Sequence, residues 1–75
     1  MDPDVNLQQQ RITAAALMSI LDGVASIESM PQGEMVAAIY LASELAELAR
    51  SLDEWIARGG FLPARWARAA QEVLS

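Results

Sequence analysis

The clearest pattern in the chain is a run of apolar residues between positions 35 and 56, spaced alternately three and four apart. This alternation occupies the a and d positions of a heptad repeat on one face of an α-helix. A second apolar column recurs every seven residues beside it, so the face is wider than one helical partner needs. The pattern predicts a helix over about residues 32–58. Its predicted oligomer seam consists of Met35, Ala38, Leu41, Ala42, Leu45, Leu48, Ala49, Leu52 and Ile56.

A weaker helical pattern covers about residues 7–27. Asn6 is the expected N-cap, because its side-chain oxygen can accept from an early helical amide. Gly23 either ends this helix or lets the backbone of another segment approach it closely. We expect the helix to continue to about Ile27. Its apolar stripe is Leu7, Ala14, Leu17, Leu21 and Val24.

The segment 28–33 is typical of a turn. Pro31 disfavours a helical residue before it and suits the first turn of a new helix. Ser29 or Met30 is then the expected N-cap of the second helix, with Glu34 near the positive helix end.

A corner follows the second helix. Two glycines end that helix, since glycine can take the left-handed conformation that satisfies its last carbonyls. If Gly60 is that residue, we expect Phe61 to contact Ile56. Pro63 then opens a short third helix over about residues 63–74. Trp55 and Trp66 are expected to hold the second and third helices together.

Residues 52–66 of this corner, LDEWIARGGFLPARW, resemble a run written LDxWLxxGGFLPxxW in small proteins of unknown function from actinobacteria and their phages. The resemblance covers about a fifth of the chain and implies an origin, but no activity. Large aromatics and arginines are typical of interface hot spots, although such aromatics are more often core and such arginines more often solvated. The candidate partner patch is Trp55, Phe61, Leu62, Arg65, Trp66 and Arg68.

Composition favours association. The chain has 75 residues, is 53% apolar, and lacks cysteine and histidine. A single core of this size rarely stabilises a fold by more than about 3–5 kcal/mol, and disulfides and soft-metal sites are excluded. We therefore predict one all-α domain over residues 1–75. It is an antiparallel helical hairpin with a short third helix, paired into a homodimer that resembles a four-helix bundle.

Candidate catalytic residues are few. No cysteine is present, and no histidine can activate a serine. Glu44 and Glu47 form an ExxE pair, followed by Asp53 and Glu54, which resembles a fragment of the magnesium motif of all-α nucleoside-triphosphate pyrophosphohydrolases. The second acidic motif of that family has no counterpart with matching spacing. We expect no enzyme, no cofactor and no metal, and keep that family as the second alternative.

The first alternative is a helix-turn-helix-like DNA-binding regulator that uses the arginines of the tail, Arg58, Arg65 and Arg68. The net charge of -5 argues against nucleic acid as a partner. The chain opens without a basic signal sequence, and the apolar stretch 12–27 is too short to span a membrane. We therefore expect a cytoplasmic, non-catalytic interaction module. It self-associates and binds a host or phage protein, in the host cytoplasm if a phage encodes it.

Overall fold

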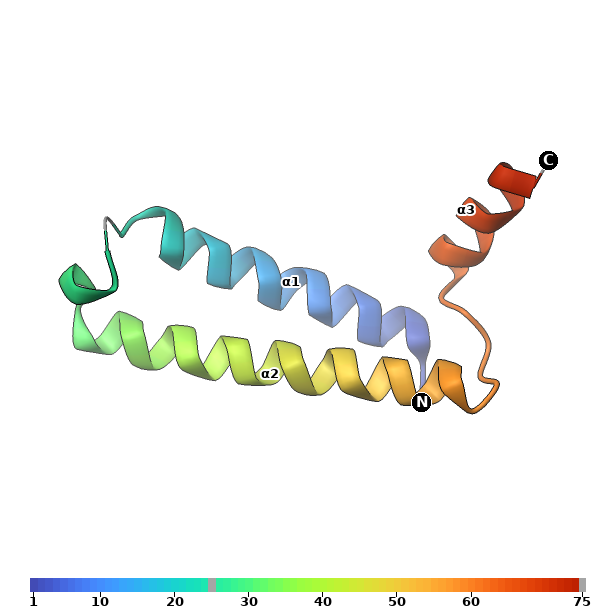
Figure 1. Ribbon diagram of the computed structural model, residues 1–75, viewed down its shortest axis with the longest axis horizontal. Coiled ribbons are helices and arrows are strands. Elements are labelled where there is room, and N and C mark those ends of the chain that lie inside the picture. The colour runs from blue at the N-terminus through green and yellow to red at the C-terminus, as the bar shows by residue number, and fades with distance from the viewer. Residues whose placement is uncertain (25, 75) are drawn as a thin grey trace.

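Three α-helices make up the described part of the protein, which is residues 1–24 and 26–74 without the side chains of Ile27, Val73 and Leu74. The computed structural model contains α1 (Pro3–Asp22), α2 (Gln32–Ala57) and α3 (Ala64–Leu74), with a 3-10 turn at Ile27–Ser29 (Figure 1). No strand occurs among these residues. The all-helical class expected from the hydrophobic pattern is therefore confirmed.

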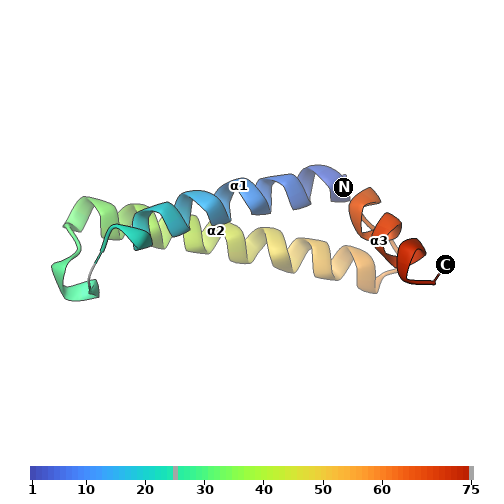
Figure 2. The same ribbon diagram turned by 90° about the horizontal axis from the view of Figure 1, so that it is seen from above.

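Helices α1 and α2 lie side by side and run in opposite directions, as Figures 1 and 2 show from two sides. The turn joins them at one end, here called the hinge end. The N-terminus and α3 lie at the other, the open end. The molecule measures 48 × 25 × 15 Å, so the hairpin is a layer one helix thick. Both faces of such a layer stay open unless something else covers them.

Helix α1 begins at Pro3 and not near residue 7, as the sequence pattern had suggested. Asp2 is its N-cap, and the Oδ1 atom accepts from the amides of Asp4 and Val5 at 3.0 and 3.3 Å. Proline suits the first helical position because its fixed φ is already helical and it has no amide to satisfy. The predicted cap, Asn6, lies inside the helix.

The other end of α1 also differs from the prediction. The helix ends at Asp22 with Gly23 as its C-cap, so it does not continue to residue 27. The side chain of Ser29 binds the backbone of Ser26 instead. Its hydroxyl donates to the Ser26 carbonyl at 2.9 Å and accepts from the Ser26 amide at 3.2 Å. Serine side chains compete with helical hydrogen bonds in this way, and glycine adds a further cost to helix continuation.

Helix α2 begins and ends within a residue of the predicted bounds. Its N-cap is Pro31, which makes no side-chain cap bond, and so neither Ser29 nor Met30 takes that role. Glu34 lies in the first turn as expected, where the positive end of the helix favours a carboxylate. α3 begins one residue after Pro63, whose carbonyl accepts from the amides of Trp66 and Ala67.

The chain has little interior. Among the described residues, five apolar side chains are buried. They are Met30, Ala38 and Leu52 along the hairpin and Pro3 and Pro63 at the open end. The accessible surface is 5561 Å², whereas a compact monomer of 8.1 kDa exposes about 4,500 Å². The radius of gyration is 15.7 Å, against about 11 Å for a compact domain of this length. The isolated chain is therefore extended and under-buried.

Candidate protein-interaction surface

Helix α1 covers only one flank of the predicted seam on α2. Ala38 and Leu52 are buried, whereas Ala42 and Ala49 are exposed. The remaining seam residues are half-buried, namely Met35, Leu41, Leu45, Leu48 and Ile56. The seam is thus divided lengthwise. The side that includes Leu41 and Leu48 packs within the chain, and the side that includes the alanines is left open.

The buried face of α1 contains polar residues that the hydrophobic pattern does not reveal. Asn6 is buried, and its Nδ2 donates to the backbone carbonyl of Leu48 in α2 at 3.0 Å. The Nε2 of Gln10 donates to the Oδ1 of Asn6 at 2.7 Å. Thr13, one turn further along the same face, is also buried. Asn6, Gln10 and Thr13 are spaced four and three residues apart and therefore share one face of α1. Their spacing alone, without their polarity, could have predicted that they face α2.

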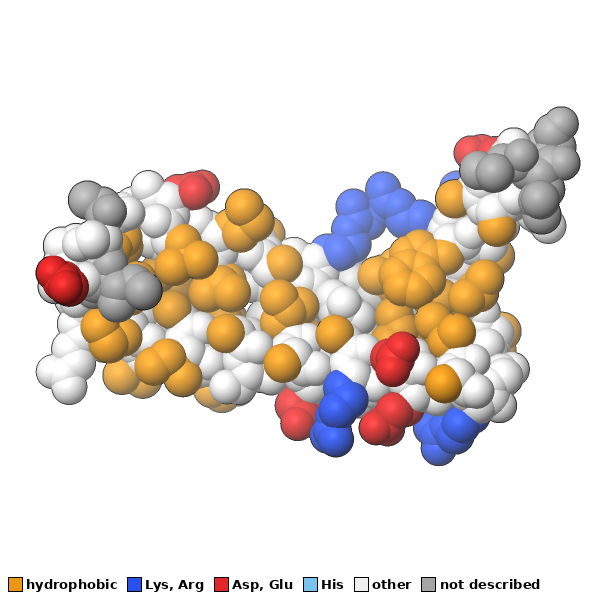
Figure 3. Space-filling view, in the orientation of Figure 1, with side chains coloured by type: hydrophobic (Ala, Val, Ile, Leu, Met, Phe, Trp, Pro, Cys, Tyr) orange, Lys and Arg blue, Asp and Glu red, His pale blue; other side chains and the backbone are white. Residues whose placement is uncertain are grey.

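An apolar groove lies between α1 and α2 near the hinge end. It encloses about 400 Å³. Two large side chains in it are well exposed, Leu21 at 46% and Ile39 at 62%. Figure 3 shows apolar side chains gathered along this side of the hairpin. We call it the hinge groove, and it is lined by Leu17, Leu21, Met30, Met35, Ala38, Ile39 and Ala42.

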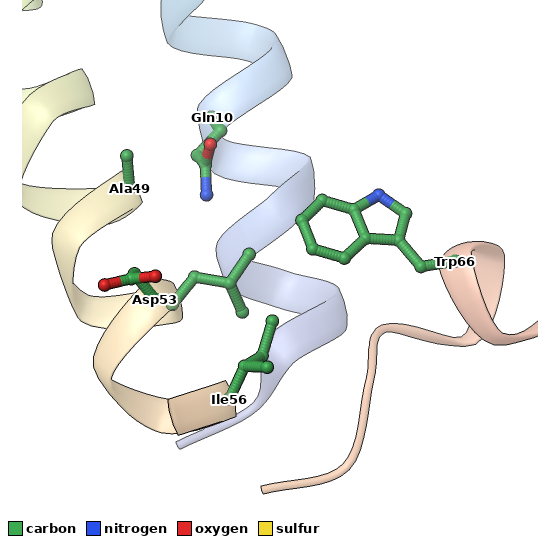
Figure 4. A pocket seen from close by; sticks show the side chains of 6 residues that line it. Gln10, Ala49, Asp53, Ile56 and Trp66 are labelled. Atoms are coloured by element: carbon green, nitrogen blue, oxygen red, sulfur yellow. The ribbon is translucent and has the colours of Figure 1, made fainter. Parts of the chain in front are cut away.

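A smaller hollow of about 190 Å³ lies near the open end. Trp66 reaches into it from α3, and Gln10 faces it from α1 (Figure 4). We call it the Trp66 hollow, and it is lined by Gln10, Ala49, Leu52, Asp53, Ile56 and Trp66.

Both hollows open on the same side of the hairpin, here called the groove face. The α2 residues that line them without being buried fall on a single helical stripe with three-and-four spacing, and the exposed Ala46 completes it. The stripe is Met35, Ile39, Ala42, Ala46, Ala49, Asp53 and Ile56. A continuous surface therefore runs from the hinge to α3, and no helix of the described chain covers it.

The corner after α2 is a Schellman motif. Gly59, and not Gly60, takes the left-handed conformation, with φ of 91°. The amides of Gly59 and Gly60 donate to the carbonyls of Ile56 and Trp55 at 3.0 and 2.9 Å, the two bonds that define the motif. A Cβ atom added at Gly60 would overlap the Trp55 indole. The two glycines are therefore needed for different reasons.

The two tryptophans have separate contacts and do not form the clamp expected between α2 and α3. The Nε1 of Trp55 donates to the carbonyl of Phe61 at 3.0 Å. Its ring meets the Phe61 ring edge to face, with centroids 5.5 Å apart. Trp66 instead lines a hollow together with Leu52 and Ile56 of α2. Trp55 thus stabilises the corner, while Trp66 belongs to the groove face.

Helix α3 is tied to the hairpin by a carboxylate from the start of the chain. The Oδ1 of Asp4 accepts from the amide of Ala64, the first residue of α3, at 2.7 Å. A negative charge at a helix N-terminus is stabilising, because it satisfies an unpaired amide and complements the helix dipole. Asp4 therefore caps a helix 60 residues away along the chain.

The residues of the candidate partner patch do not form one uniform surface. Trp55 is half-buried in the corner. Phe61 is exposed at 63%, Trp66 at 41%, and Leu62, Arg65 and Arg68 are also exposed. That these exposed residues meet a protein partner stays a prediction.

The acidic pair expected to resemble a metal motif lies on the outer face of α2. Glu44 and Glu47 are both exposed, and Glu47 pairs with Arg50 at 3.2 Å. Exposed ion pairs of this kind contribute about 0–1 kcal/mol. Glu54 meets Arg58 through its backbone, since the Nε of Arg58 donates to the backbone carbonyl of Glu54. Among the described residues, no three acidic side chains gather as a metal ion would require.

Comparisons with protein-family models, curated proteins and solved structures found no match for this chain. None of the helices in the described ranges combines the length and apolar character needed to cross a membrane. What the protein does is therefore inferred from its own residues and their geometry.

Proposed function

We propose that this protein is a non-catalytic protein-interaction module that works as a homodimer, with the groove faces of two copies packed together. One observation carries the proposal: the hinge groove exposes large aliphatic side chains between two helices that have no third helix over them. Contiguous apolar surface of this kind is typical of association sites. Two stacked hairpins form a four-helix bundle.

The area of the surface fits a second copy. The chain exposes about 1,000 Å² more than a compact monomer of its mass. A standard stable interface buries about 800 Å² on each partner. A second copy that buries this standard area would therefore remove an amount of surface close to the excess that each chain presents.

The opposite face of the hairpin is a weaker candidate for the dimer contact. It also carries exposed apolar residues, among them Val5 and Ile12, which lie seven residues apart on α1. However, both hollows open on the groove face. Packing into a hollow removes more apolar surface from water than packing onto a convex helix, which favours the groove face.

We further propose that a different protein binds at the corner between α2 and α3. The resemblance of this corner to actinobacterial and phage proteins implies no catalytic activity. Phe61 and Leu62 stand exposed there beside Arg65 and Arg68. Apolar side chains interleaved with arginines suit a partner surface that is apolar and acidic.

A charge placed in the hinge groove tests the dimer. Ile39→Glu puts an unpaired carboxylate into the contact, so we expect light scattering after size exclusion to give the monomer mass where the wild type gives twice that mass. Val36→Glu is the matched control, because Val36 is as exposed (61%, against 62% for Ile39) and lies outside the groove. Dissociation by both variants, or by the control alone, would contradict the proposed contact.

A further inference from the structure

We infer that the two copies pack head to tail, so that the hinge end of each lies against the Trp66 hollow of the other. This inference rests on the proposed homodimer and specifies its geometry. The alternative is a hinge-to-hinge dimer, in which both turns lie at the same end of the bundle.

The distribution of charge favours the head-to-tail arrangement. The chain has five basic residues, and none lies between Arg11 and Arg50, so the hinge half is without a positive charge. That half carries Asp22, Glu28 and Glu34. Figure 3 shows acidic but no basic side chains toward the hinge end of this face. A hinge-to-hinge dimer brings six such carboxylates together, whereas a head-to-tail dimer brings each set toward residues 1–11 and 50–75, where five arginines balance five acids.

The Trp66 hollow gains an occupant in this arrangement. Trp66 is 41% exposed, and the hollow it lines is mostly apolar but open to solvent. Its volume of about 190 Å³ accommodates one large aliphatic side chain, of the kind that lines the hinge groove. Each dimer then contains two equivalent composite contacts, as a two-fold axis requires. In both, α3 of one copy covers the hinge end of the other.

Distances between two identical spin labels distinguish the arrangements. The chain has no cysteine, so Gln32→Cys at the first residue of α2 and Ser43→Cys near its middle each give one nitroxide per copy. Both sites are exposed and lie outside the two hollows. Because α2 has 26 residues and is about 39 Å long, pulsed dipolar spectroscopy should give about 40 Å between Gln32 labels in a head-to-tail dimer.

A hinge-to-hinge dimer places the two Gln32 labels across one end of the bundle, within about 20–30 Å for helices spaced 8–10 Å apart. The Ser43 labels lie near the middle of α2 and give about 20–30 Å in either arrangement. Short distances at both sites would overturn the head-to-tail inference and keep the homodimer. Absence of a dipolar signal between Ser43 labels would instead contradict the homodimer itself.

Discussion

At the scale of single residues, the protein depends on side chains whose roles are not visible in a hydrophobic pattern. Asn6 matches a common N-cap type, and its polarity gives no reason to place it between two helices. The structure gives capping to Asp2 and uses Asn6 to hold the backbone of α2. In the same way, two adjacent glycines predict a helix end, but only the backbone shows that Gly59 takes the positive φ.

Removing the Asn6 amide should destabilise the hairpin. Asn6→Ala leaves Gln10 without its acceptor and deletes the bond to the Leu48 carbonyl, so the free energy of unfolding should fall by about 1–3 kcal/mol. Gln8→Ala is the control, because Gln8 is exposed on the same helix. Urea unfolding followed by circular dichroism at one fixed protein concentration measures both. Equal midpoints for the two variants would show that the buried amide contributes no stability.

At the scale of elements, the sequence predicts the helices well and their attachment poorly. The bounds of α2 and α3 follow from periodicity, proline and glycine, which act locally. The start of α1 was wrong by a turn because Asp2 and Asn6 are both good caps. The position of α3 depends on Asp4 and Ala64, which lie 60 residues apart, and no local signal reports such a contact.

The Asp4 contact gives a prediction for α3. Asp4→Ala removes the acceptor of the Ala64 amide, so α3 should open more often and its amides should exchange with deuterium several-fold faster. α1 should be little affected, since its own cap is Asp2. Asp22→Ala, an exposed acid at the far end of α1, is the control. Unchanged exchange in α3 of the Asp4 variant would show that other contacts hold the helix.

At the scale of the whole molecule, the width of the apolar face of α2 was the informative signal in the sequence. The structure bears out its premise, because one α-helix leaves part of that face open and the described chain has only a small interior. The sequence did not show which part. Leu41 and Leu48 pack within the chain, and the free stripe is the one that includes Ile39 and Ala46. That a second copy covers this stripe is the proposal on which the function depends.

Sedimentation equilibrium of the unmodified chain at micromolar concentration tests that proposal most directly. We predict a mass twice the 8.1 kDa of one chain, with dissociation on dilution accompanied by loss of helical circular dichroism, because an under-buried hairpin is marginally stable alone. A single species of 8.1 kDa that keeps its helical signal at every concentration would contradict the account.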